Sequence, residues 1–226
     1  MAMLGFYGGT FDPIHQGHLQ LALYVQKFCQ LDQLQILPCH LPPHRAHPGV
    51  SSAHRAAMVQ LAIAPYPQLQ LNRLELDKNA PSYTAETLQQ LKQQHPQDTL
   101  LFVIGMDSLC QFTRWHRWQD ILQLCHLLVC QRPGYQPDDP ITQQLLLQHQ
   151  ATQLSQLQQQ PSGLILLLDN PLLDISASEI RAALFSGQPS SQPAVPTSGQ
   201  TQQRVDPALQ ISAVSGYIRQ HQLYSV

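Results

Sequence analysis

The feature that most constrains the fold is a series of short, continuous apolar runs that alternate with segments of helical periodicity. Continuous runs are typical of strands in a parallel sheet that is buried on both faces. We expect strands at 3–7, 33–37, 99–104, 126–130 and 163–168, and helices near 18–29, 53–64, 84–95, 117–124, 178–186 and 207–221. This alternation predicts an α/β fold with a Rossmann-like, doubly wound parallel sheet, whose ligands bind at the carboxyl ends of the strands.

Length and composition limit the class of protein. The chain has 226 residues, which fits one domain over 1–226 with a small C-terminal helical portion. Its net charge of -2 argues against broad nucleic-acid binding. The five cysteines form no Cys-x-x-Cys pair, and neither a signal peptide nor an apolar span of membrane length is found. We therefore expect a cytoplasmic protein with no membrane partner; the oligomeric state stays open, and a homo-oligomer is one possibility.

Three stretches stand outside this regular alternation. Residues 69–76 are expected to form an extra extended segment. Residues 136–161 are rich in glutamine with leucines at helical spacing, which predicts one amphipathic surface helix. Residues 187–206 are rich in Pro, Ser, Gln and Gly without apolar periodicity. That composition predicts a flexible loop, which we expect to lie away from the chemistry.

The eleven residues from Gly8 to His18 read GGTFDPIHQGH and connect the first expected strand to the first expected helix. A strand, a glycine turn and a helix start form a phosphate cradle in many α/β proteins. His15 and His18 are three residues apart and share one face of the first helical turn. The G-x-G-x-x-G motif of dinucleotide-binding proteins and the Gly-Lys-Ser/Thr motif of Walker loops are both absent. We therefore expect these histidines to supply the positive charge that binds the phosphates. The same spacing also fits two ligands of a metal ion.

A second dense motif, ISASEIR, covers Ile175 to Arg181. Ser176 and Glu179 make a capping box, so a helix starts here, and this role needs no ligand. Ser178 adds a hydroxyl and Arg181 a planar cation close to the helix N-terminus. These groups suit the β- and γ-phosphates of a triphosphate.

Together the two motifs resemble the HxGH nucleotidyltransferase superfamily, and in particular the bacterial nicotinate-nucleotide adenylyltransferase family. The resemblance covers about 3–187 and 207–224. It implies adenylyl transfer from ATP to nicotinate mononucleotide, which yields deamido-NAD and pyrophosphate in NAD biosynthesis. It also implies direct in-line displacement without a covalent intermediate, with Mg²⁺ accompanying ATP and no metal site made by the protein.

The resemblance further implies the residues of the site. The catalytic residues would be His15, His18 and Arg181. ATP would contact Gly8, Gly9, Thr10, Phe11, His15, His18, Gly105, Ile175, Ser176, Ser178 and Arg181. The acceptor would contact His44, Arg45, Tyr83, Thr84, Asp107, Trp115, His116 and Arg132.

The residues assigned to the acceptor lie in several short segments that resemble motifs of this family. PPHR at 42–45 would form a basic loop over the phosphates, and Thr84 would meet the nicotinate carboxylate. Asp107 would reach a ribose hydroxyl, Trp115 would stack on the pyridine ring, and Arg132 would contact the acceptor phosphate. Without the resemblance, the PPHR segment is equally consistent with a surface turn, Thr84 with a helix N-cap, and the tryptophan with a core position.

The chain departs from the family pattern at Cys39-His40, where asparagine is frequent, and at Gln131, where a second arginine is common. Three alternatives stay open. The acceptor could be nicotinamide mononucleotide, alone or together with the acid. The eleven histidines could mark a metal-binding protein. A non-catalytic nucleotide sensor would bind ATP without turnover.

Overall fold

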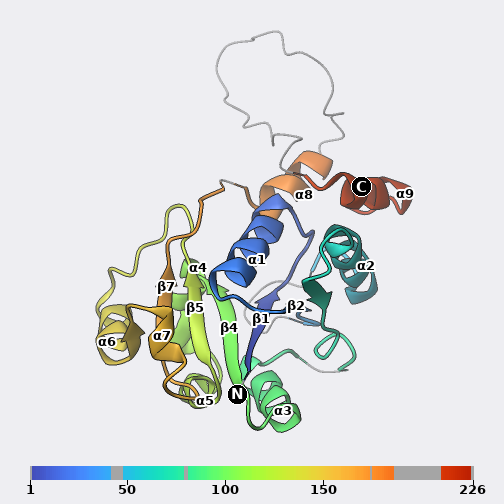
Figure 1. Ribbon diagram of the computed structural model, residues 1–226. Coiled ribbons are helices and arrows are strands. Elements are labelled where there is room, and N and C mark those ends of the chain that lie inside the picture. Colours follow the sequence, from blue (N-terminus) through green and yellow to red (C-terminus); the bar gives the residue numbers. More distant parts are fainter. Residues whose placement is uncertain (1, 42–47, 79–80, 174, 186–209, 225–226) are drawn as a thin grey trace, which may run out of the picture.

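The computed structural model describes residues 2–41, 48–78, 81–173, 175–185 and 210–224 (Figure 1). Within these ranges a seven-stranded sheet has the order β3-β2-β1-β4-β5-β7-β6, and each strand pair is parallel. The strands are β1 (Met3–Gly9), β2 (Leu34–Pro38), β3 (Leu69–Leu71), β4 (Thr99–Gly105), β5 (His126–Cys130), β6 (Gln150–Ala151) and β7 (Ile165–Leu168). The α/β doubly wound prediction is confirmed.

Helices connect the strands and follow the last one. They are α1 (Gln16–Phe28), α2 (Ser52–Ile63), α3 (Thr84–Gln94), α4 (Met106–Leu109), α5 (Trp118–Leu124), α6 (Pro140–His149), α7 (Leu154–Leu157), α8 (Ala177–Phe185) and α9 (Ser212–Gln220), with a 3₁₀ turn, η1, at Phe112–Arg114. In Figure 1, α8 lies close to the start of α1, beyond the ends of the central strands.

The strand order reverses at β1, which pairs with both β2 and β4. Tyr7 of β1 lies opposite Ile36 of β2 on one side and Val103 of β4 on the other. The chain leaves β1 in one direction, reaches the sheet edge at β3, and returns to the other side of β1 as β4. Ligands of doubly wound folds bind at such a switch point, outside the carboxyl ends of the strands.

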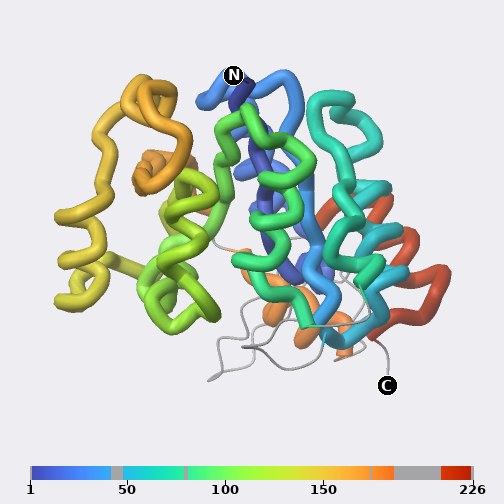
Figure 2. The backbone as a smooth tube through the Cα atoms, turned by 90° about the horizontal axis from the view of Figure 1, so that it is seen from below, coloured from blue at the N-terminus to red at the C-terminus, as the bar shows by residue number. Residues whose placement is uncertain are grey.

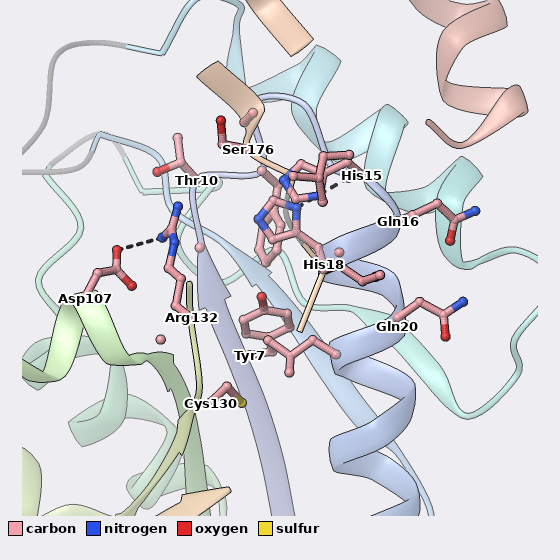
Figure 3. A pocket seen from close by; sticks show the side chains of 18 of the residues that line it. Tyr7, Thr10, His15, Gln16, His18, Gln20, Asp107, Cys130, Arg132 and Ser176 are labelled. Carbon is pink, nitrogen blue, oxygen red and sulfur yellow. Dashed lines mark hydrogen bonds and ion pairs between the residues drawn. The ribbon is translucent and has the colours of Figure 1, made fainter. Parts of the chain in front are cut away.

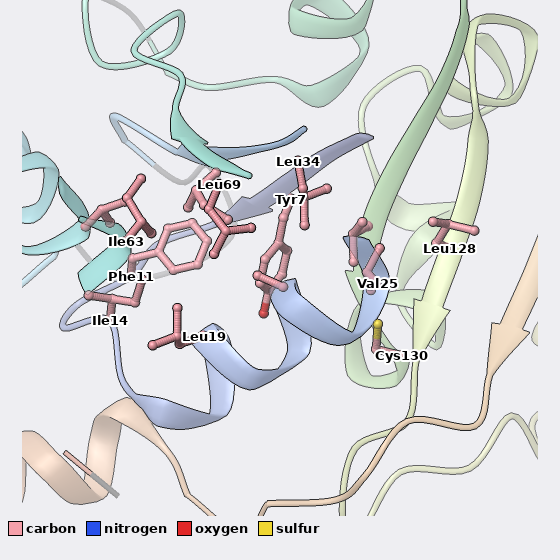
Figure 4. Packing of buried hydrophobic residues seen from close by; sticks show 14 of the residues in the cluster. Tyr7, Phe11, Ile14, Leu19, Val25, Leu34, Ile63, Leu69, Leu128 and Cys130 are labelled. Atoms are coloured by element: carbon pink, nitrogen blue, oxygen red, sulfur yellow. The ribbon is translucent and has the colours of Figure 1, made fainter. Parts of the chain in front are cut away.

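The sheet is covered on both faces, as its continuous apolar strands predict. Tyr7 belongs to a core cluster with side chains of α1 and α2, such as Leu19 and Ile63 (Figure 4). Its neighbour Phe6 points to the opposite face and packs with side chains of α3 and α5. Figure 2 shows α3 and α5 side by side on that face. Two packed layers therefore hold the end of β1 rigidly in place.

The prediction of one helix over 136–161 is wrong. Asp139 caps α6 by accepting from the N–H groups of Ile141 and Thr142 at 3.1 and 2.9 Å, and β6 then interrupts the helical pattern. β6 forms because Gln150 and Ala151 pair with β7 at the sheet edge. Such a pairing depends on a distant strand and leaves no local periodicity.

Two sequence predictions fall outside the described residues: the loop at 187–206 and the PPHR segment with His44 and Arg45. The extended segment expected at 69–76 is present only at its start: β3 covers Leu69–Leu71, and residues 74–77 form a turn closed by the hydrogen bond from the Asp77 N–H to the Arg73 carbonyl. All five cysteines are described, and no disulfide joins them. Among the described helices, none has both the length and the apolar character needed to cross a bilayer.

Candidate active site

A cleft of about 1060 Å³ opens at the carboxyl ends of β1, β4 and β5. A second pocket of about 460 Å³ adjoins it, and Gly8, Gly9, Thr10 and Asp107 line both. The end of β1 therefore forms a shared wall. Two neighbouring cavities with a common wall can hold two substrates whose reacting groups meet at that wall.

The structure sorts the sequence-predicted residues between the two cavities. The larger cleft contains the whole predicted ATP set: Gly8, Gly9, Thr10, Phe11, His15, His18, Gly105, Ile175, Ser176, Ser178 and Arg181. The smaller pocket contains most of the described acceptor set: Tyr83, Thr84, Asp107, Trp115 and His116. Arg132 differs, because it lines the larger cleft beside the ATP set.

His15 and His18 stack on each other at the start of α1 (Figure 3). Their ring centroids lie 3.8 Å apart, with 34° between the planes. His15 is the N-cap residue, and its backbone N–H donates to Nδ1 of His18 at 3.3 Å. Because Nδ1 of His18 accepts this bond, the neutral ring carries its proton on Nε2, which is then a hydrogen-bond donor.

His15 is neutral at pH 7. Its side chain is buried, with 5% exposure, and this burial, assisted by the positive charge of Arg132, lowers its pKa to about 4. The expectation that both histidines act as cations is therefore wrong for His15. The cleft takes its positive charge from groups such as Arg132 and Arg181, which both line it.

Aromatic contacts hold the ring of His18. The edge of Phe11 meets it with centroids 5.1 Å apart, and Phe11 in turn meets Tyr7 at 5.4 Å. Phe11 is 2% exposed, so its side chain acts mainly as packing at the cleft floor. These aromatic contacts, together with the stacking on His15, restrict the orientation of the His18 ring.

The predicted capping box is present at the start of α8. The Ser176 hydroxyl accepts from the Glu179 N–H at 3.2 Å, while the Glu179 carboxylate accepts from the Ser176 N–H at 3.0 Å. The box sets the direction of α8 so that Arg181 reaches the turn after β1. Nη1 of Arg181 donates to the Asp12 carbonyl at 2.7 Å, and Nη2 donates to Ser178 Oγ at 3.2 Å.

Asp107 and Arg132 form an ion pair beyond the ends of the neighbouring strands β4 and β5, with Nη1 2.7 Å from Oδ2 (Figure 3). Asp107 lies in α4, directly after β4, and Arg132 follows β5. Their side chains are 13% and 44% exposed, so the arginine is the more accessible partner. Any substrate oxygen that binds the Arg132 guanidinium must compete with the carboxylate of Asp107.

Aromatic rings shape the smaller pocket. Tyr83 and His116 lie with centroids 4.7 Å apart and both line it. Trp115 also lines the pocket and packs on Phe112 at 5.6 Å. Trp118 also contacts Phe112, with ring centroids 5.9 Å apart, but does not line the pocket. The pocket thus offers flat apolar surface for an aromatic ring, and Trp115 rather than Trp118 supplies it.

The sequence matches the cytidylyltransferase-like family over residues 6–183. It is 47% identical over 187 residues to the "Probable nicotinate-nucleotide adenylyltransferase" of Cellvibrio japonicus, covering 82% of this chain and 88% of the relative. The protein of the same name from Cronobacter sakazakii is 42% identical over 227 residues, 99% of this chain and 96% of the relative. The chain belongs to the nicotinate-nucleotide adenylyltransferase family.

A solved structure shares the fold. The Plasmodium falciparum nicotinic acid mononucleotide adenylyltransferase complexed with NaAD superposes with a TM-score of 0.72, covering 99% of this chain and 98% of that one. The two sequences are 18% identical, so this likeness concerns the fold alone.

The two departures from the pattern of the adenylyltransferase family lie at the site. Cys39 lines the smaller pocket, with its sulfur 3.8 Å from Thr10 Oγ1. The backbone N–H of His40 donates to Ser82 Oγ at 2.9 Å, which ties the loop after β2 to the start of α3. Gln131 donates to Asp169 Oδ1 at 3.1 Å at the rim of the larger cleft.

Arg55 of α2 is a buried part of the site that the sequence analysis missed. Its side chain is fully buried, and Nη1 donates to the carbonyls of Thr10 at 2.8 Å and Cys39 at 2.7 Å. Nη2 donates to the carbonyl of His40 at 2.9 Å. One guanidinium thereby joins the loops that follow β1 and β2. The available signal was an arginine on the apolar stripe of α2, three residues before Met58.

Glu75 was missed as well. It lines the smaller pocket with 5% exposure, and burial raises its pKa. Among the described residues, no group of three or more His, Cys, Asp or Glu side chains lies close enough to hold a metal ion. The donors gathered in the larger cleft suit an anion.

Proposed function

We propose that this member of the family transfers the adenylyl group of ATP to nicotinate mononucleotide, giving deamido-NAD and pyrophosphate by direct in-line displacement. The observation that carries the proposal is the convergence of His15 and His18 with Arg181 in one cleft, beside a second pocket that shares the end of β1. The names of the relatives support the choice of reaction and acceptor.

The reaction joins a phosphate oxygen of the acceptor to the α-phosphorus of ATP and breaks the bond from that phosphorus to the bridging oxygen. Pyrophosphate leaves with the bonding electrons. The attacking phosphate is ionised at neutral pH, so no general base is required, and a neutral His15 is compatible with this chemistry. The remaining work is alignment of the two phosphates and stabilisation of the charge that develops on them.

The described residues divide this work between them. Nε2–H of His18 would donate to an α-phosphate oxygen, because its Nδ1 is already used by the backbone of His15. Arg181 and the N-terminus of α8 would hold the β- and γ-phosphates. On the acceptor side, Trp115 would stack on the pyridine ring. When the acceptor binds, the ion pair between Arg132 and Asp107 would break. Arg132 would then bind the acceptor phosphate, and Asp107 would accept a hydrogen bond from a ribose hydroxyl.

Mg²⁺ would enter as part of the substrate, bound to ATP. Among the described residues that line the larger cleft, the carboxylates are Asp12 and Asp107, and both are already bonded to protein groups, so phosphate oxygens and water would hold the ion. Its charge would offset part of the negative charge of the triphosphate.

The test is a reaction of the purified protein with ATP and nicotinate mononucleotide, followed by chromatography of the products. We expect one pyrophosphate for each dinucleotide formed, and none without the acceptor. An ATP analogue with a chiral sulfur-substituted α-phosphate should give inversion at phosphorus. Retention, or an adenylylated protein, would refute the single displacement.

We also propose that the protein is located in the cytoplasm. A cytoplasmic location agrees with five cysteines that form no disulfide, two of them, Cys125 and Cys130, fully buried.

A further inference from the structure

Tyr224, close to the C-terminus of the chain, reaches the turn that carries the histidine motif. Its hydroxyl donates to Asp12 Oδ1 at 2.5 Å, and both side chains are buried, with 5% exposure each. The φ of Tyr224 is 59°, in the left-handed region that residues other than glycine seldom adopt. A strained backbone persists only where the surroundings hold it, and here the bond to Asp12 is such a restraint.

Asp12 connects three parts of the site. Its second oxygen, Oδ2, accepts from the Gly49 N–H at 2.7 Å. The same oxygen lies 3.8 Å from Nη1 of Arg181, beyond hydrogen-bond distance, while that Nη1 donates to the backbone carbonyl of Asp12. The hydrogen bonds to the two carboxylate oxygens therefore come from Tyr224 and Gly49, while Arg181 stays within ion-pair distance of Oδ2 without a hydrogen bond to it.

The ring of Tyr224 also packs on Gly49. A β-carbon at Gly49 would lie 3.2 Å from Cε1 of Tyr224, so the close approach favours glycine there. Gly49 follows the segment with His44 and Arg45 by a few residues along the chain. One C-terminal side chain thus contacts both the turn after β1 and Gly49, which lies shortly before α2.

We propose that Tyr224 is a positioning residue for adenylyl transfer, which acts on Arg181 through Asp12. With Oδ1 held by Tyr224 and Oδ2 by Gly49, the carboxylate does not form a direct hydrogen-bonded ion pair with Arg181, and the guanidinium stays directed toward the triphosphate. Without the hydroxyl, Oδ1 lacks its donor and the carboxylate turns to Arg181, which draws positive charge away from the phosphates. The inference rests on the proposed function.

The chain offers a matched control in Tyr217 of α9. Its hydroxyl is hydrogen-bonded to Nδ1 of His54 in α2 at 3.0 Å, so it too attaches the C-terminal segment to the body of the protein. Tyr217 lines neither the larger cleft nor the smaller pocket. Tyr217→Phe weakens the same attachment and leaves Asp12 untouched.

The experiment compares Tyr224→Phe, Tyr217→Phe, Arg181→Ala and the double variant Tyr224→Phe/Arg181→Ala by steady-state kinetics and melting temperature. For Tyr224→Phe we expect kcat to fall roughly tenfold, with the KM of the acceptor changed less than about twofold. Tyr217→Phe should keep kcat within about twofold of the wild-type value, even if its melting temperature falls as much as that of Tyr224→Phe. In the Arg181→Ala background, adding Tyr224→Phe should change kcat less than about twofold, because the group through which it acts is gone.

Three results would overturn the inference: an unchanged kcat in Tyr224→Phe, an equal loss in Tyr217→Phe, or independent effects of Tyr224→Phe and Arg181→Ala. A wild-type protein that releases no pyrophosphate would count against the proposed function instead. In that event ATP affinity, measured by calorimetry, becomes the readout. Weaker ATP binding by Tyr224→Phe alone would support the positioning role, and equal binding by both tyrosine variants would reject it.

Discussion

The backbone N–H of His15 donates to Nδ1 of His18 at 3.3 Å, while the two imidazole rings stack with centroids 3.8 Å apart. The orientation of His18 is therefore set by the backbone at the start of α1 and by the ring edge of Phe11. Both restraints come from one continuous stretch of chain. A donor fixed in this way loses little freedom when charge develops on a substrate.

Replacing His18 with alanine should reduce kcat by roughly 10²–10³, the usual cost of removing one well-placed donor to a developing charge. The affinity for the acceptor should stay within a few-fold, since His18 lines the larger cleft and not the smaller pocket. Pyrophosphate release and calorimetric acceptor binding measure the two effects. His95→Ala, at the surface end of α3, is the control. A wild-type kcat in His18→Ala would show that His18 does not contribute to catalysis.

His15 should make stability depend on pH. Its folded-state pKa of about 4 lies below the unfolded value near 6.5, so between these values the unfolded chain binds a proton that the folded chain does not. Stability is then lost as the pH falls from about 6.5 through about 4. A difference of this size corresponds to about 3 kcal/mol once the pH has passed both values, given a pKa of about 4.

Urea unfolding at pH 7, 6 and 5, with His15→Asn alongside, measures this contribution. Wild type should lose more stability than the variant over this range. Direct titration of the His15 ring by NMR is the independent check. A midpoint near 6.5 would show that burial does not keep this ring neutral.

Arg132→Ala should raise the KM for the acceptor by at least about tenfold, as expected for the loss of a charge-assisted bond to phosphate. The ion pair with Asp107 shows that this guanidinium can hold an anionic oxygen at the wall between the two cavities. Arg73→Ala removes an arginine from another exposed ion pair, 3.0 Å from Asp77, and should leave the KM unchanged. Should Arg132→Ala raise only the KM for ATP, the residue would belong to the ATP set that surrounds it.

Arg55→Met should lower the free energy of unfolding by at least about 3 kcal/mol, because three part-buried carbonyls lose their donor. These are the carbonyls of Thr10, Cys39 and His40. Urea unfolding measures the loss, and Arg55→Lys, which keeps a charge and some donors, should recover part of it. A change below about 1 kcal/mol would mean that the loops after β1 and β2 hold their places without the guanidinium.

The sequence predicted those parts of the fold and the site that depend on neighbouring residues. The continuous apolar runs indicate buried parallel strands, and both site motifs lie within single strand-turn-helix segments, so local spacing is informative. Arg55 was missed because its partners are carbonyls of two loops that only the folded chain brings together. The bond between Tyr224 and Asp12 spans 212 positions and leaves no local pattern. The neutral state of His15 depends on burial that composition does not reveal.

The preference that we propose for the acid acceptor has its structural basis in the smaller pocket. Tyr83 is the N-cap residue of α3 and makes no side-chain cap, so the first backbone N–H groups of this helix remain suited to a carboxylate. A nicotinate carboxylate can accept from them with both oxygens. The carboxamide of nicotinamide mononucleotide carries no charge and presents one oxygen.

The most direct test is the ratio of kcat/KM for nicotinate mononucleotide to that for nicotinamide mononucleotide, measured with ATP by pyrophosphate release. We expect turnover with the acid and a preference for it of at least about tenfold. A preference for the amide, or no pyrophosphate with either acceptor, would contradict it.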